Sequence, residues 1–215
     1  MLKDLPHRRG RRYILDLIEQ GEHQQQDFKY SVSDACKIAR SISAFSNAEG
    51  GRLLIGVKDN GTVAGVRNEE DIYVVEQAAT LYCRPSVDVS FKAYTCDTNV
   101  VIIEATVPRS HARPVVCREA EGGWRAYYRV ADENIVAHPL MVKAWQTSSA
   151  EFSLTAQVMN VIETLKAYRE GLDIDQLARL TNSSIRSTEQ TVVSLVAAGV
   201  ATFIYRAPRF RIALA

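Results

Sequence analysis

The chain has 215 residues, of which 47% are hydrophobic, and its 26 Lys and Arg residues are balanced by 25 Asp and Glu residues. This length suits one large or two small globular domains, and the balanced charge excludes a global field that would draw the chain onto nucleic acid or an anionic membrane. No apolar run is long enough to cross a bilayer, and no hydrophobic segment follows the basic N-terminus. We therefore expect a cytoplasmic protein with neither a transmembrane helix nor a signal peptide.

The first thirty residues combine a basic stretch with a short helix and a strand. Residues 6–12 contain four arginines, which could hold phosphates or could form a solvated, mobile terminus. Apolar residues then recur at helical spacing up to Gly21, which can end a helix. The segment from Glu22 to Lys29 predicts the lead into a strand, with Phe28 in the core and Asp27 on the opposite side.

Residues 34–66 predict a helix, a glycine turn and a hairpin. Asp34 or the serine before it can cap a helix that ends near Asn47, where Gly50 and Gly51 favour a chain reversal. A strand over 52–57 and a second over 62–66 should flank the turn at residues 60–61, because Asn-Gly is a strong hairpin signal. The glycines fit a role in backbone geometry, whereas Asn47 and Glu49 could also contact a ligand.

Residues 69–130 predict one more helix and a set of strands. The helix spans 69–82, and strands follow over 87–94 and 99–107, the second being almost continuously branched and apolar. A further hairpin should join 114–118 to 124–130. Between these strands, the loop with Arg109 and Arg113 is a candidate basic contact surface. Arg129, at the end of the hairpin, is either a further contact or part of a surface ion pair.

The motifs of residues 10–138 resemble the Schlafen AlbA-like domain, formerly called a divergent AAA domain. The similar features are Ala-Phe-Ser-Asn-Ala-Glu-Gly-Gly at 44–51, Leu-Leu-Ile-Gly-Val-Lys-Asp-Asn-Gly at 53–61, the acidic positions of residues 22–29, and Tyr-Tyr-Arg-Val at 127–130. The resemblance implies a mixed α/β domain, which we place at 1–145. Despite the older family name, the chain has no Gly-x-x-x-x-Gly-Lys-Ser/Thr run, so we expect no ATP site.

The same resemblance implies a candidate catalytic metal site. Schlafen nucleases bind a divalent cation through two acidic residues and a third in the hairpin, and the matching positions here are Glu22, Asp27 and Asp59. Such a cation, Mg²⁺ or Mn²⁺, would orient water and stabilise charge on a phosphate. Asp27 stands where the family usually has Glu. Acidic residues at these places are also ordinary turn formers and surface charges.

The C-terminal segment has a different pattern. Residues 146–149 are the expected linker, and helices are predicted over 154–168, 174–180 and 185–198, followed by strands over 200–205 and 209–213. Three helices and a hairpin in this order resemble the winged helix-turn-helix, which we place at 152–215. In that module the third helix enters the major groove and the wing contacts phosphate.

The chemistry at the start of the third helix suits nucleic acid. Short hydroxyls can contact phosphates, and arginine and glutamine can pair with base edges. Wing arginines without acidic neighbours would add positive charge. The candidate contacts are Ser184, Arg186, Ser187, Gln190, Arg206, Arg209 and Arg211. Polar residues at a helix start can also be simple caps, and many winged helices bind only proteins.

The sequence thus predicts an α+β protein with a Schlafen AlbA-like domain followed by a winged helix-turn-helix. We expect a regulator that binds double-stranded DNA as a homodimer, without a cofactor and without a membrane partner. A metal-dependent endonuclease acting on structured RNA and a protein-interaction module are the alternatives. The four cysteines have no paired spacing, which indicates buried free thiols and not a disulfide framework or a zinc site.

Overall fold

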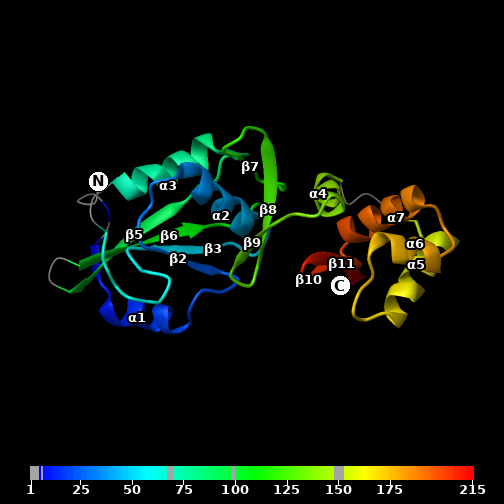
Figure 1. The fold of residues 1–215 in the computed structure, drawn as a ribbon, viewed down its shortest axis with the longest axis horizontal. Helices are drawn as coiled ribbons and strands as arrows, with labels where there is room; N and C mark the ends of the chain where they lie inside the picture. Colours follow the sequence, from blue (N-terminus) through cyan, green and yellow to red (C-terminus); the bar gives the residue numbers. More distant parts are fainter. Residues whose placement is uncertain (1–4, 6, 67–69, 98–99, 148–152) are drawn as a thin grey trace. The chain divides into compact units, whose positions relative to one another are not determined.

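The computed structural model describes residues 5, 7–66, 70–97, 100–147 and 153–215. The chain divides into two compact units, Met1–Val136 and Ala137–Ala215, which are described separately (Figure 1). The predicted linker residues 148–149, and the predicted first residues of the 69–82 helix and the 99–107 strand, lie outside the described residues. The α+β class predicted from the sequence is confirmed.

The first unit is built on a five-stranded sheet with the order β1-β5-β6-β3-β2. Its strands are β1 (His7–Arg9), β2 (Gln26–Lys29), β3 (Gly51–Ile55), β5 (Ser90–Asp97) and β6 (Val100–Val107). The outer pairs β1–β5 and β2–β3 are parallel, and the inner pairs are antiparallel. The basic segment is therefore not only a mobile terminus, because part of it forms the edge strand β1.

Helices cover both faces of this sheet (Figure 1). Helix α1 (Arg11–Glu19) packs Ile14 and Leu17 against Phe28 and Leu54 on one face. Helices α2 (Ala35–Asn47) and α3 (Glu70–Leu81) bury the other face around Leu53. Because successive strand residues point to opposite faces, Asp27 lies on the α2 side of the sheet, as its period-two position predicted.

Helix α2 begins and ends as the sequence predicted. The Asp34 side chain accepts hydrogen bonds from the amides of Cys36 and Lys37. At the other end, Gly50 has a φ of +75°, and a Cβ there would lie 2.9 Å from the amide nitrogen of Arg109. Glycine is thus required for conformation and for space. Because Gly50 has no Cβ, the loop of residues 108–114 has room to lie against the end of α2.

A four-stranded antiparallel sheet completes the first unit, with the order β4-β7-β8-β9. Its strands are β4 (Cys83–Arg84), β7 (Val116–Arg118), β8 (Trp124–Val130) and β9 (Glu133–Val136). The predicted hairpin of β7 and β8 is confirmed, whereas β9 was not predicted. Helix α2 packs against one face of this sheet, where Cys83, Cys117 and Tyr127 are buried. All four cysteines are free thiols.

The predicted hairpin at Asn60–Gly61 is only partly formed. The chain does reverse there, with the Gly61 amide donating to the Lys58 carbonyl. The predicted second strand over 62–66 is wrong, because only an isolated bridge joins Val57 to Val63. The amides of Ala64 and Gly65 still donate to the Gly56 carbonyl, and the Val66 amide then donates to the Val101 carbonyl of β6.

The described residues of the second unit form four helices and a hairpin. The helices are α4 (Pro139–Gln146), α5 (Ala156–Ala167), α6 (Ile174–Leu180) and α7 (Ile185–Ala197), and the strands are β10 (Ala201–Arg206) and β11 (Arg209–Leu214). A bridge between Leu172 and Ile212 ties the α5–α6 connection to the hairpin. Asp173 and Ser184 cap α6 and α7. Within the described residues, no helix is long and apolar enough to cross a membrane.

Helix α4 was not predicted, and it changes the domain boundary. The sequence predicts a first domain that extends to residue 145, whereas the contacts place residues from Ala137 onward in the second unit. His138 caps α4 by accepting from the Leu140 amide, and its ring stacks on Phe203 with centroids 4.9 Å apart. Proline at the first helical position is a normal start signal.

Candidate nucleic-acid interface

Arg129 is not a surface residue. It is 1% exposed, and its guanidinium donates to the carbonyl of Gln26 at 3.0 Å and to the side chain of Asn134 at 2.9 Å. The same group lies 3.5 Å from the Asp27 carboxylate and over the Phe45 ring. The prediction of Arg129 as a nucleic-acid contact or surface ion pair is therefore corrected: it is a buried organising cation that joins β2, α2, β8 and β9.

Asn47 is likewise used internally. It is fully buried, and its amide nitrogen donates to the carbonyls of Val115 and Tyr127, both at 2.8 Å, while its oxygen accepts from the Val115 amide. These backbone groups lie beyond the end of the β7–β8 pairing, and the Val115 carbonyl also accepts a hydrogen bond from the Ser43 hydroxyl. Asn47 thus joins α2 to the β7–β8 hairpin, and it has no room to contact a ligand.

The loop with Arg109 and Arg113 does form a polar surface. Arg109 is exposed and lies 3.8 Å from the Glu49 carboxylate, and Arg113 is half-buried and donates to the Asn47 carbonyl. Burial raises the pKa of the Tyr128 hydroxyl, and the nearby Glu49 charge raises it further. The charges of Arg113 and Arg109 act in the opposite direction. The structure therefore brings Arg109, Arg113, Glu49 and Tyr128 together at the end of α2.

The three acidic residues of the predicted metal site do not assemble. Glu22 and Asp27 are neighbours: burial, and then a hydrogen bond with Asp27, raises the pKa of Glu22. Asp59 is exposed in the loop after β3, and among the described residues no three His, Cys, Asp or Glu side chains form a group that could hold a metal ion. Lys29 also lies 2.7 Å from the Asp27 carboxylate. With that lysine and Arg129 beside Asp27, the residues present do not fit a divalent cation.

On α7, the predicted contacts divide into exposed and engaged residues. Ser184, Arg186 and Gln190 are exposed. Ser187 is half-buried, and its hydroxyl accepts a 2.6 Å hydrogen bond from Gln157 of α5. Its side chain therefore serves helix packing, while the other three remain accessible to a partner.

The hairpin arginines also differ from one another. Arg209 and Arg206 are exposed, but Arg206 lies 3.6 Å from the Glu170 carboxylate, so the expectation of a wing without acidic neighbours is wrong. Arg211 is half-buried, with its guanidinium 3.5 Å from the Gly171 carbonyl. An exposed ion pair of this kind contributes little stability, and Arg206 can exchange Glu170 for another anion.

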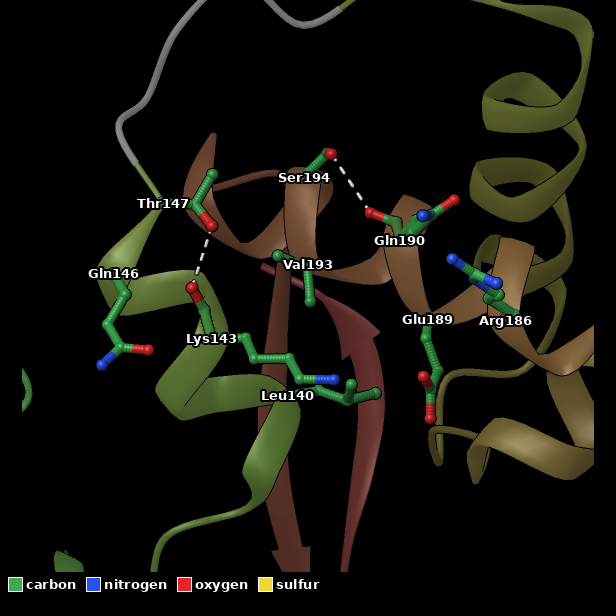
Figure 2. Close-up of a pocket in the computed structure, with 9 residues that line it drawn as sticks. All are labelled: Leu140, Lys143, Gln146, Thr147, Arg186, Glu189, Gln190, Val193 and Ser194. Atoms are coloured by element: carbon green, nitrogen blue, oxygen red, sulfur yellow. Dashed lines mark hydrogen bonds between the residues drawn. The ribbon is translucent and has the colours of Figure 1, made fainter.

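A groove of about 550 Å³ runs between α4 and α7. Figure 2 shows Lys143 extending from α4 into this space, with Arg186 and Gln190 on the α7 side. Leu140 and Val193 supply apolar surface, and the remaining lining residues are polar: Gln146, Thr147, Glu189 and Ser194. Lys143 and Gln146 were missed because they lie in the segment expected to approach a linker. The signal that could have found them was the His-Pro pair that starts α4.

Comparisons with known proteins concern mainly the first unit. The family model described as Schlafen, AlbA_2 matches residues 22–138. A search of curated proteins gives no match. Among solved structures, the DIP2311 protein from Corynebacterium diphtheriae is 16% identical with a TM-score of 0.43, over 87% of this chain and 34% of that chain. The chain thus spans about a third of that protein's length. Because the family model covers more than half of the residues, the chain belongs to the Schlafen AlbA_2 family.

Proposed function

We propose that this protein binds double-stranded DNA and acts as a transcriptional regulator, with residues 152–215 as a winged helix-turn-helix. Helix α7 would enter the major groove, and the β10–β11 hairpin would be the wing. Membership of the AlbA_2 family favours a function related to nucleic acid. The observation that carries the proposal is the exposure of Arg186 and Gln190 one helical turn apart on α7, next to the exposed hydroxyl of Ser184.

These side chains have the chemistry that duplex recognition needs. Arginine can bind guanine and glutamine can bind adenine through paired hydrogen bonds in the major groove. Residues four apart in a helix lie on the same side, so Arg186 and Gln190 can reach neighbouring bases together. Arg209 on the hairpin can contact the phosphates beside the groove. The proposed reader is a homodimer, because one such module covers only a short half-site.

The test is selection of binding sequences from a random duplex pool with the full chain, followed by anisotropy titration of a selected duplex. We expect Arg186→Ala and Gln190→Ala each to weaken binding by about 5- to 150-fold and to relax the preference at different base positions. Lys166→Ala is the control, since Lys166 is an exposed cation of the same unit, on α5. It should bind as the wild type does.

Three outcomes would count against this function. Undiminished binding by both α7 variants would move the interface elsewhere. Equal losses on every sequence would make the two residues phosphate contacts and remove the sequence-reading role. If the chain selects no duplex at all, a protein-interaction role replaces the proposal.

A further inference from the structure

The four-stranded sheet of the first unit has a second face that α2 does not cover. Residues opposite each other in antiparallel strands share a face. Trp124 of β8 is opposite Arg118 of β7, and Tyr128 follows on the same side of β8. Arg84 of β4 is opposite Val116, which shares that face with Arg118. This second face therefore carries the exposed Arg84, Arg118 and Trp124, while Tyr128 is half-buried and Ala126 between the two rings is buried.

Trp124 is exposed, so packing in the hydrophobic core does not account for a tryptophan at this position. Its side chain is 38% exposed, and the guanidinium carbon of Arg84 lies 4.0 Å from the ring centre. Arg84 and Arg118 are both exposed. The indole is therefore flanked by two cations, of which one already fixes its orientation by a cation–π contact.

The other end of β8 is also basic. Near Tyr128, Arg113 and Arg109 lie together with the Glu49 carboxylate, which is 3.8 Å from Arg109. Besides Glu49, two exposed carboxylates of the described residues lie at the edges of the face: Glu121 in the β7–β8 turn and Glu133 on β9. Arginines thus stand at both ends of a stripe that runs from Trp124 to Tyr128 along β8.

We propose that this stripe binds single-stranded nucleic acid, with an unpaired base stacked on Trp124 and its Arg84 partner and with phosphates held by Arg118 and by the exposed Arg109. Alternating aromatic rings and cations are the surface that such a strand requires. In a duplex the bases already stack on each other, so few base faces are available to stack on an exposed indole. This proposal concerns the first unit and does not rest on the proposed function of α7.

The spacing of the rings also favours an extended strand. Tyr128 is four positions after Trp124, which corresponds to about 14 Å along β8. A stacked strand rises only about 3.4 Å per nucleotide, so neighbouring stacked bases cannot reach both rings. A flexible strand with splayed bases can.

The experiment is titration of fluorescein-labelled oligothymidylate with the full chain, read by anisotropy. Trp124→Ala should weaken binding at least about fivefold, and Trp124→Phe should retain most of it, because stacking depends on an aromatic face. Arg84→Gln and Arg118→Gln should each lower the affinity and the salt dependence. Arg125→Gln is the matched control: this exposed arginine is next to Trp124 but points to the opposite face, in register with Cys117.

A second measurement tests direct contact. In a Trp145→Phe background, Trp124 is the sole tryptophan of the chain, and its fluorescence should be quenched when the oligonucleotide binds. The double variant of Arg186 and Gln190 should still bind the single strand, which separates this proposal from the duplex reader. Circular dichroism and thermal melting check that each variant is folded.

Four results would overturn the proposal: no binding of oligothymidylate, unchanged affinity in folded Trp124→Ala, equal loss in Arg125→Gln, or binding without quenching of Trp124. If Trp124→Ala instead changes only the oligomeric state in sedimentation, the face is a contact between copies of this chain, and the proposal is wrong.

Discussion

In the first unit, the arginine that stood out in the sequence, Arg129, is 1% exposed and surrounded by groups of its own domain. In the second unit, Arg186 is exposed at the edge of an open groove. Both residues looked like nucleic-acid contacts in the sequence, because an arginine in a short motif carries the same chemistry in either place. The difference teaches that burial decides the role: Arg129 stabilises a fold, whereas Arg186 is available to a partner.

The largest effect that tests this comparison is expected from Arg129→Met. Methionine can occupy much of the volume of the arginine stem, but it removes the donor to the Gln26 carbonyl and leaves Lys29 as the cation beside Asp27, so we expect the lower end of the range for a broken buried pair. Breaking a buried pair by removing one partner typically costs about 3–5 kcal/mol. Urea unfolding of the full chain, followed by circular dichroism, measures the change in the free energy of unfolding.

Arg125→Met is the control for that measurement, because Arg125 is an exposed residue of the same strand. Exposed substitutions of this kind usually change stability by less than about 0.5 kcal/mol. If Arg129→Met unfolds at the wild-type urea concentration, the network around Arg129 makes no net contribution to stability. If instead it stays folded but loses nucleic-acid binding, the contrast between the two units is wrong.

A smaller effect, on binding and not on folding, is expected from Lys143→Ala. This prediction depends on the proposed duplex reader, since Lys143 extends from α4 into the groove beside Arg186 (Figure 2). A lysine that contacts one phosphate contributes about 0.9 to the slope of log affinity against log salt. Loss of Lys143 should therefore reduce that slope by about one and weaken all duplexes alike.

Lys166→Ala serves again as the control for Lys143→Ala and should keep the wild-type slope. A Lys143→Ala variant with an unchanged slope would exclude α4 from the interface while leaving α7 as the reader. A change in sequence preference would mean that Lys143 touches bases and not phosphate.

Local signals explain why most of the fold could be predicted. The caps Asp34, Asp173 and Ser184 sit directly before the helices that they start, and the apolar spacing within those helices gives their buried faces. The β7–β8 hairpin followed from its glycine turn. These features depend on residues within a few positions of one another, so the sequence contains them explicitly.

The errors at the candidate site come from contacts between distant segments. Arg129 contacts Gln26, which is far away in sequence, and Arg206 pairs with Glu170, which lies in the α5–α6 connection. The predicted metal site required the loop with Asp59 to lie beside Glu22. No local sequence pattern indicates whether these two residues are close in space. Period two along β8 does place Arg129 on the same side as the core residue Tyr127, so one local pattern does indicate its burial.

The smallest effect concerns His138, which caps α4 and belongs to neither proposed contact surface. Burial lowers the pKa of His138, and the nearby Glu189 acts in the opposite direction. The folded state therefore prefers neutral imidazole, whose Nδ1 accepts the Leu140 amide hydrogen. The stability that this contact gives is present above the unfolded pKa of about 6.5 and is lost as the pH falls through the lower folded pKa.

Fluorescence of Trp145 on α4, in a Trp124→Phe background, can follow this change during thermal unfolding at about pH 7.5 and about pH 5.5. We expect a decrease of at most the roughly 1 kcal/mol typical of an N-cap. His138→Asn should remove that part of the pH dependence, because asparagine caps a helix without titrating. If the asparagine variant loses as much stability at acid pH as the wild type, the titrating group lies elsewhere. In that case the stability of α4, the helix at the start of the second unit, does not depend on the protonation of His138.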